Sequence, residues 1–284
     1  MSLGFKMAGF HSIFASDVDE NAGKTFMRNF PNTPLKVKDI CQITKEEVDE
    51  LTGGISPDVI IGGPPCQGFS LANKRRNKIK DDPRNRLFYQ FVKFIDWYSP
   101  KAFVMENVKG LLSMKKGSVI NTIIEEFTNA GVGYHVKFQV LCASDYGVPQ
   151  MRERVIIIGV RKDLDIEPSF PSPIKGSVNV DEAISDLPLI NSSEGAEVQD
   201  YTMEPTNDYQ RLMRRDSKKV YNHAAMHHTS RLIERFKASS LSFSKTHPSS
   251  LTLKGGSTAF PKPLSPQGTG DVPTALLGAQ TATL

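Results

Sequence analysis

The stretch from residue 57 to residue 70 most limits how this chain can fold. Three consecutive β-branched residues at 59–61 are followed by two glycines. Such a run predicts a short strand that is buried on both faces of a parallel sheet. Two prolines then exclude a helix and hold the next residues extended, so Cys66 stands on a stiff turn beyond the strand. In open α/β sheets, ligands bind at that edge.

The thiol of Cys66 has two interpretations. A lone cysteine is most often a buried structural residue. Against this, the glycines at 62, 63 and 68 leave little side-chain bulk to bury the thiol, and Pro-Pro is a poor core segment. A stiff loop instead suits a nucleophile that must meet a flat electrophile at one angle. The sequence therefore favours a nucleophile.

Composition sets the class of protein. With 39% hydrophobic and 23% charged residues among 284, the chain is typical of globular proteins of one large or two modest domains. A net charge of only +4 means that attraction to polyanions must come from local patches. Three cysteines without Cys-x-x-Cys spacing predict neither a disulfide framework nor a zinc knuckle. No apolar run reaches membrane-spanning length, so we expect a cytoplasmic protein without membrane contact.

Strand and helix patterns alternate along the first 162 residues. This alternation predicts an α/β fold with a doubly wound, mostly parallel sheet and an antiparallel edge strand near its end. A capping-box pattern at Thr44 marks one helix start, and Pro100 limits one helix end. The expected strands are 12–16, 35–40, 59–61, 102–105, 135–141 and 155–160. One expected helix covers the first residues up to Gly9, and a second passes through residues 22–30. Three more are expected over 44–51, from 83 to before Pro100, and over about 118–130.

The alternation ends near residue 163. We expect an irregular region over 163–238 and an irregular or disordered tail over 239–284 that is rich in Ser, Thr, Pro and Gly. Between 209 and 237, eight basic residues stand against two acidic ones, a plausible phosphate footprint. His223, His227 and His228 lack a supporting carboxylate or cysteine spacing, so no metal site is predicted.

Three signatures follow one another in the chain. They are Gly-Pro-Pro-Cys-Gln-Gly-Phe-Ser at 63–70, Glu-Asn-Val at 106–108 and Gln-x-Arg-x-Arg at 150–154. Their joint order and placement resemble the cytosine-5 DNA methyltransferase family over residues 1–162, with a looser echo near Asn222-His223. The resemblance implies a Rossmann-like, S-adenosylmethionine-dependent catalytic domain, followed by a smaller target-recognition region.

The resemblance also implies catalytic roles. Carbon 5 of cytosine is a poor nucleophile, so in this family a thiolate, here Cys66, first adds to carbon 6. Glu106 is implied at ring nitrogen 3, and Asn107 is implied to hold the local backbone. Arg154 is implied at the exocyclic oxygen, with Arg152 in support, because a fixed guanidinium fork suits a planar target. The cytosine must be flipped out of duplex DNA to reach these groups.

For cofactor and DNA, the resemblance implies two sets of residues. S-adenosylmethionine would contact Asp17, Val18, Asp39, Ile40, Pro65 and Leu87. Double-stranded DNA would contact Ser70, Lys74, Arg75 and Arg76 of the basic loop between 70 and 85, together with Arg214, Arg215, Lys218 and Lys219. Taken singly, each cofactor residue could equally be a helix cap or a core residue. The basic loop could equally be a solvent-exposed loop without a ligand.

Two family blocks have no match in the chain. The family begins with a strand and a Gly-rich turn around the methionine part of the cofactor, whereas this sequence opens in the following helix. No match to the family's C-terminal block is found. We therefore expect a truncated product, a sheet that lacks a central strand, and unpaired edges on that strand's neighbours.

The functional interpretations stay open between classes. The first is a DNA cytosine-5 methyltransferase, expected to be a monomer in a restriction-modification or DNA-marking role, with a cognate restriction endonuclease acting on the same site and nucleoid association through DNA. The second is an inactive DNA-binding remnant, and the third is a tRNA cytosine-5 methyltransferase relative. A thiol hydrolase would need a histidine partner for Cys66, and no local pattern names one.

Overall fold

The structure is a computed structural model, and it describes residues 1–65, 86–174, 176–215, 217–235 and 280–283. The backbone divides into two compact units. The first holds residues 1–141, 153–171 and the strand at 280–283, and the second holds 142–152 and the described residues between 172 and 235. Within the described residues, no helix is long and apolar enough to cross a bilayer.

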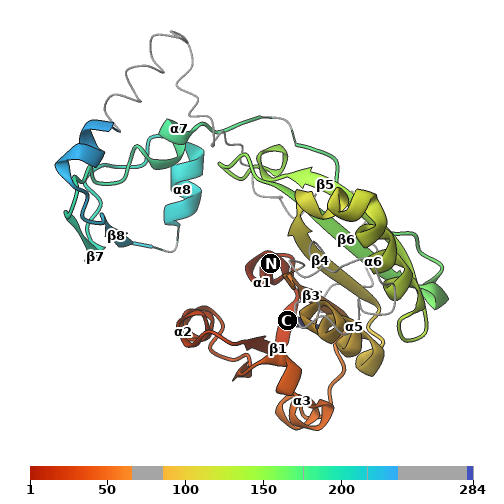
Figure 1. Cartoon of the computed structure of the whole chain (residues 1–284). Coiled ribbons are helices and arrows are strands. Elements are labelled where there is room, and N and C mark those ends of the chain that lie inside the picture. Colours follow the sequence, from red (N-terminus) through yellow and green to blue (C-terminus); the bar gives the residue numbers. More distant parts are fainter. Residues whose placement is uncertain (66–85, 175, 216, 236–279, 284) are drawn as a thin grey trace. The chain divides into compact units, whose positions relative to one another are not determined.

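The elements of the first unit alternate as the sequence predicts (Figure 1). Its strands are β1 (His11–Asp17), β2 (Leu35–Val37), β3 (Val59–Gly62), β4 (Ala102–Val108), β5 (Tyr134–Cys142), β6 (Glu153–Arg161) and β9 (Gln280–Thr283). Its helices are α1 (Ser2–Met7), α2 (Glu20–Asn29), α3 (Lys45–Thr52), α5 (Arg86–Tyr98) and α6 (Ser118–Asn129). Short 3-10 helices are η1 (Ile40–Gln42), η4 (Lys109–Leu112), η5 (Met114–Gly117), η6 (Ala143–Tyr146, in the second unit) and η7 (Lys162–Leu164).

The described strands form one seven-stranded sheet in the order β2-β1-β9-β3-β4-β6-β5. The pairs from β2 to β4 are all parallel, and β6 runs antiparallel to β4. This confirms the predicted doubly wound, mostly parallel sheet. The antiparallel strand was expected at the edge, but β6 lies inside the sheet and β5 takes the edge.

The expectation of a missing central strand is wrong. Strand β9 pairs in parallel with β1 on one side and with β3 on the other, so both neighbours have a partner. The sequence Gln-Thr-Ala-Thr lacks the apolar run that marks a buried parallel strand, which is why composition assigned it to an irregular tail. Residues 239–279 of that expected tail lie outside the described residues.

Capping residues explain where two of the helices begin. The Asp19 carboxylate accepts hydrogen bonds from the backbone N–H groups of Asn21 and Ala22, each at 2.8 Å, at the start of α2. At the start of α3, Thr44 and Glu47 form the predicted reciprocal capping box. Helix α3 therefore begins within one residue of the predicted position.

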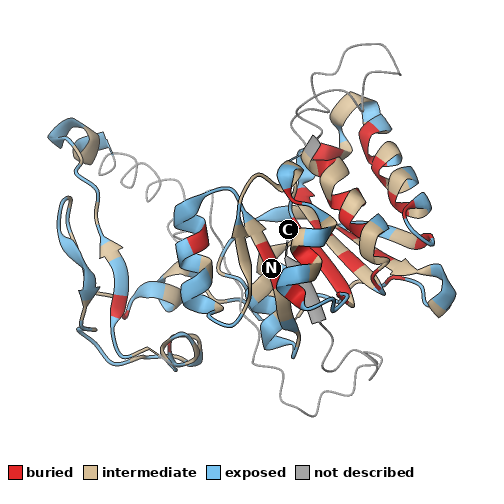
Figure 2. Ribbon diagram, turned by 90° about the horizontal axis from the view of Figure 1, so that it is seen from below, coloured by how far each residue is buried: buried red, intermediate tan, exposed pale blue. Residues whose placement is uncertain are grey.

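Buried aromatic side chains of α5, β4 and α6 lie in the core of the first unit. Figure 2 colours the buried residues red. The ring of Phe103 on β4 packs 4.4 Å from Phe127 on α6 and 5.2 Å from Tyr134 on β5, measured between centroids. Gly159 pairs with Phe103 across the β4–β6 ladder, and any side chain there would overlap the Phe103 ring. This packing fixes β4 and β6, the two strands that carry the catalytic signatures.

The second unit is small and contains a two-stranded antiparallel sheet, β7 (Gly195–Gln199) with β8 (Val220–Ala224). Two helices accompany it, α7 (Val180–Ile184) and α8 (Asp208–Arg214). Compared with the expected boundary at 162–163, the first unit continues to residue 171, and residues 142–152 group with the second unit.

Candidate active site

Two predicted catalytic residues meet at the carboxyl end of β4. Glu106 on β4 and Arg154 on β6 lie diagonally across the antiparallel ladder, because Glu106 pairs with Ile156 and Val108 pairs with Arg154. The Arg154 Nε lies 2.8 Å from the Glu106 Oε1, and both side chains are about one-quarter to one-third exposed, at 25% and 30%. The guanidinium Nη1 also donates to the Glu153 carbonyl at 2.8 Å. The ion pair is thus held at a solvent-accessible edge.

The end of β3 lies directly beside this ion pair. Gly62 is in register with Met105, so Gly63 follows beside Glu106. A Cβ at Gly63 would lie 3.3 Å from the Glu106 Oε2, tighter than ordinary van der Waals contact. A glycine here therefore lets the carboxylate lie close to the loop that leaves β3.

The buried side chain of Asn107 ties β4 to the same loop. Its Nδ2 donates to the Pro64 carbonyl at 2.9 Å, and its Oδ1 accepts from the Val108 N–H at 3.0 Å. The backbone two residues before Cys66 is thereby fixed to the strand that presents Glu106. Cys66 itself lies outside the described residues, so its assignment as nucleophile stays a prediction.

Arg152 was predicted to support Arg154. Its backbone N–H donates to Gln150 and its carbonyl accepts from Ala143, each at 2.9 Å, and the residue is exposed. It belongs to the second unit, unlike Arg154. The supporting role of the Arg152 side chain stays a prediction.

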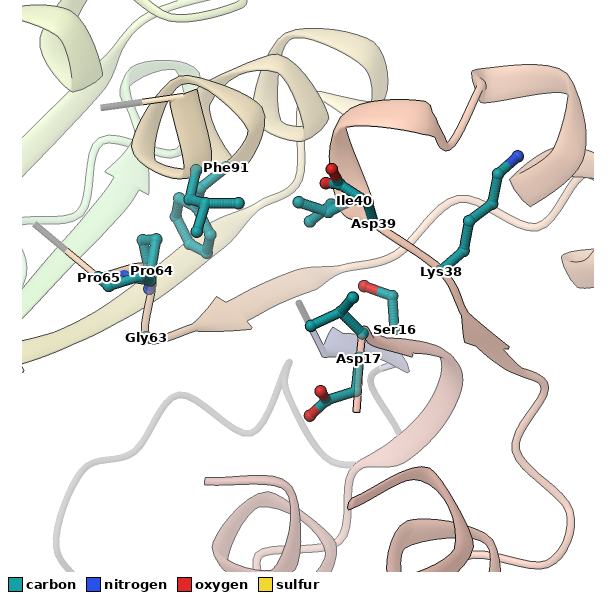
Figure 3. A pocket seen from close by; sticks show the side chains of 11 residues that line it. Ser16, Asp17, Lys38, Asp39, Ile40, Gly63, Pro64, Pro65 and Phe91 are labelled. Atoms are coloured by element: carbon teal, nitrogen blue, oxygen red, sulfur yellow. The ribbon is translucent and has the colours of Figure 1, made fainter. Parts of the chain in front are cut away.

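A pocket of about 390 Å³ lies at the same edge of the sheet. All six predicted cofactor residues line it: Asp17, Val18, Asp39, Ile40, Pro65 and Leu87. In Figure 3 the two prolines and Phe91 lie on one side of the pocket, and Asp17 and Asp39 lie on the other. Two carboxylates at strand ends and a set of apolar walls therefore share one cavity.

The sequence interpretation missed five lining residues: Ser16, Lys38, Gly63, Pro64 and Phe91. Phe91 stands one helical turn after Leu87 on α5, so the helical period could have identified it. Gly63 and Pro64 directly follow a predicted strand, and residues in that position commonly line the ligand site of an α/β sheet. Lys38 carried no signal, because a lysine after a short strand reads as solvated.

Lys38 links the two pocket segments that carry Asp17 and Asp39. Its backbone N–H donates to the Asp17 carbonyl at 2.9 Å, which joins the end of β1 to the residue before Asp39. Its Nζ lies 3.0 and 3.1 Å from the two Glu47 oxygens on α3. Hydrogen bonds from Lys38, from the Thr44 backbone and from Lys36 lower the pKa of Glu47 from 4.5 to about 2. The segment carrying Asp39 is thus fastened to both β1 and α3.

The predicted DNA-contacting residues divide into two groups. Ser70, Lys74, Arg75 and Arg76 lie outside the described residues. In the second unit, Arg215, Lys218 and Lys219 are exposed, and Lys219 lies 2.6 Å from Asp200.

Arg214 is different, because its side chain is only 15% exposed. It contacts the buried Asp186 at 3.3 Å and donates to the Met203 carbonyl at 2.8 Å. Its guanidinium also lies 3.7 Å from the centroid of the Tyr201 ring. These contacts hold the second unit together and occupy the guanidinium.

The histidines of the second unit have protein partners. His223 Nε2 lies 2.8 Å from the Pro188 carbonyl, and His227 Nδ1 lies 3.0 Å from the Ser193 hydroxyl. In the part of the chain that the structure describes, no group of three or more His, Cys, Asp or Glu could hold a metal ion.

Comparison with known proteins decides the family. The family model for C-5 cytosine-specific DNA methylases matches residues 1–266. The chain belongs to this family. The predicted resemblance is therefore confirmed, and it extends well beyond residue 162.

Two curated relatives of this chain illustrate the similarity. The Type II methyltransferase M.DdeI of Desulfomicrobium norvegicum is 48% identical over 245 residues, covering 84% of this chain and 57% of its own. The Type II methyltransferase M1.HphI of Haemophilus parahaemolyticus is 36% identical over 235 residues, covering 82% and 56%. The chain thus spans about half the length of these relatives.

Among solved structures, the fold is similar to that of an E. coli protein assigned as a DNA modification methyltransferase encoded within a prophage. The TM-score is 0.68 at 26% identity, covering 83% of this chain and 71% of that one. The predicted Rossmann-like methyltransferase fold is confirmed.

Proposed function

We propose that this DNA methylase family member transfers a methyl group to carbon 5 of a flipped-out cytosine in duplex DNA. One observation carries the proposal: the pocket that contains Asp17 and Asp39 reaches Pro64 and Pro65, while Asn107 ties Pro64 to the strand of Glu106. The residue next in sequence after Pro65 is Cys66. A methyl donor, a thiol and a carboxyl group would therefore meet at one sheet edge.

The proposed methyl donor is S-adenosylmethionine, and the pocket residues fit its nucleoside. Asp17 is the last residue of β1, where a carboxylate can accept hydrogen bonds from ribose hydroxyls. Asp39 would accept from the adenine amino group, while the side chains of Ile40, Leu87 and Phe91 offer apolar walls for the ring. When bound, this cofactor supplies an electrophilic methyl group.

The chain's own residues activate the cytosine. The Cys66 thiolate adds to carbon 6 while Glu106 donates a hydrogen bond or proton to ring nitrogen 3. The displaced electron density is then stabilised at that nitrogen, and carbon 5 becomes nucleophilic. Arg154 keeps Glu106 in place through the 2.8 Å ion pair and directs its remaining N–H groups toward the exocyclic oxygen. Once carbon 5 carries its methyl group, loss of its proton and elimination of the Cys66 sulfur restore the ring.

The substrate is proposed to be double-stranded DNA that is read by the region from 163 to 238. The exposed cations Arg215, Lys218 and Lys219 support phosphate contacts there. Arg214 is left out of this proposal because its guanidinium is occupied within the second unit. Flipping the base costs a few kcal/mol, at least partly repaid by contacts to the extruded cytosine.

A restriction-modification role is the biological setting that we propose, with a cognate endonuclease that cuts the same site and a monomeric methyltransferase. Relatives named as Type II methyltransferases support it. Expression of the chain beside candidate endonuclease genes, with plasmid protection as readout, tests the pairing. Light scattering of the purified chain tests the monomer.

The activity is tested with tritiated S-adenosylmethionine and genomic duplex DNA, followed by bisulfite sequencing of the product. We expect tritium in the DNA, and we expect cytosines in one recurring sequence context to resist bisulfite conversion. The variant Cys66→Ala provides the control and should incorporate no label. If the parent chain binds DNA but transfers no label to it, the chain is a DNA-binding remnant. If the parent chain labels tRNA and not DNA, the proposed substrate class is wrong.

A further inference from the structure

An exposed ion pair lies at the end of the β4–β6 ladder, next to Glu106 and Arg154. Lys109 Nζ lies 2.7 and 2.9 Å from the two Glu153 carboxylate oxygens. The last registered pair of the β4–β6 ladder is Val108 with Arg154, so Lys109 and Glu153 are the next residues beyond it. Because side chains alternate along a strand, the Glu153 side chain, the first on β6, points to the opposite face from Arg154.

Glu153 has a second contact that reaches the catalytic face. Its carbonyl oxygen accepts a hydrogen bond from Arg154 Nη1 at 2.8 Å, while Arg154 Nε binds Glu106. The guanidinium is therefore held at two points, and one of them is the backbone of Glu153. Any rotation of the Glu153 peptide would move that acceptor and turn the guanidinium away from Glu106.

We infer that the Lys109–Glu153 pair is a positioning pair for Arg154, an inference that rests on the proposed methyl transfer. Lys109 holds both oxygens of the Glu153 carboxylate and so stops the first residue of β6 from fraying. The Glu153 carbonyl then stays where Arg154 Nη1 needs it. The two side chains are 56% and 49% exposed, so the pair adds little to global stability and acts on the rate instead.

The chain offers a matched control at the other end of the same strand. Lys101, just before β4, lies 2.7 Å from Asp58, just before β3, and its side chain is 48% exposed. This ion pair has similar length and exposure, but it lies at the opposite end of β4 from the catalytic pair. The variant Lys101→Met should therefore leave the rate unchanged.

The experiment measures kcat, the KM for DNA, the KM for S-adenosylmethionine and the Tm of the full chain. We expect Lys109→Met and Glu153→Gln each to lower kcat three- to tenfold with KM for S-adenosylmethionine and Tm unchanged. Lys109→Arg and the charge-exchanged Lys109→Glu, Glu153→Lys double variant should return to within twofold. Simple attraction to DNA predicts otherwise, because losing Lys109 would raise KM for DNA and losing Glu153 would lower it, with kcat unchanged.

A second measurement does not depend on activity. The ¹H–¹⁵N signal of the Arg154 Nε group, identified by its loss in Arg154→Lys, should exchange slowly with water in the parent chain and in Lys101→Met. It should exchange at least tenfold faster in Lys109→Met. Equal exchange in the two methionine variants overturns the inference even if the chain methylates DNA, whereas an inactive parent chain with the expected exchange pattern overturns only the proposed function.

Discussion

Asn107 donates its side-chain amide to the carbonyl of Pro64, a residue 43 positions earlier in the sequence, at 2.9 Å. One end of this bond is the strand that presents Glu106, and the other is the loop that continues to Cys66. The bond thus ties the backbone that precedes Cys66 to the strand of Glu106.

Replacing Asn107 with Asp tests this bond with almost no change in shape. The carboxylate cannot donate to Pro64, so the loop loses this hydrogen bond and the fold loses about 1 kcal/mol. We expect single-turnover methylation to fall at least tenfold. The control is Asn129→Asp, since Asn129 donates to the Glu125 carbonyl on an exposed part of α6. Equal rates for the two variants would show that the bond has no catalytic role.

The pocket assignment is tested through Asp17. If this carboxylate accepts from the ribose hydroxyls, Asp17→Ala should raise the Kd for S-adenosylmethionine about tenfold, or about 1.4 kcal/mol. Calorimetric titration of the chain provides the measurement. Glu50→Gln, which removes a carboxylate from α3 outside the pocket lining, is the control. An unchanged Kd for the Asp17 variant would remove this residue from the cofactor site.

Much of this site could be predicted from the sequence, since strand ends in an α/β fold meet at one edge. Asp17 follows one predicted strand, Asp39 lies at the carboxyl end of the next, and Pro65 lies in the loop after a third; all three line one pocket. Two features could not be predicted. Strand β9 has a polar composition and is defined only by its pairing to β1 and β3. Arg214 reads as a surface cation, because the burial of Asp186 depends on tertiary packing.

The acid behaviour of Glu47 follows from its bonds to two lysines. Because these bonds lower its pKa from 4.5 to about 2, the carboxylate stabilises the fold above pH 4.5, and this contribution is lost as the pH falls toward 2. The Tm of Glu47→Gln should be below that of the parent at pH 6, and the difference should shrink toward pH 2.5. Thermal melts across this range measure it. A difference that stays constant with pH would contradict the assigned pairing.

Arg214 is expected to stabilise the second unit instead of binding DNA. Replacing it with Ala leaves Asp186, whose side chain is 4% exposed, without this partner, at a cost of about 3 kcal/mol. The control on the same helix is Arg211→Ala, which breaks an exposed pair with Asp208 and should cost under about 0.5 kcal/mol. Urea unfolding compares the two. An Arg214 variant of full stability with weaker DNA binding would reverse the assignment.

The central claim is most directly tested by the covalent adduct between this chain and a duplex that contains 5-fluorocytosine, in the presence of S-adenosylmethionine. The fluorine blocks the last elimination, so a working site stays bonded to the DNA. Mass spectrometry of the digested complex should find one adduct, on the peptide that contains Cys66, and none in Glu106→Ala. An adduct on Cys41 or Cys142, or no adduct from a chain that binds both DNA and cofactor, would contradict the account.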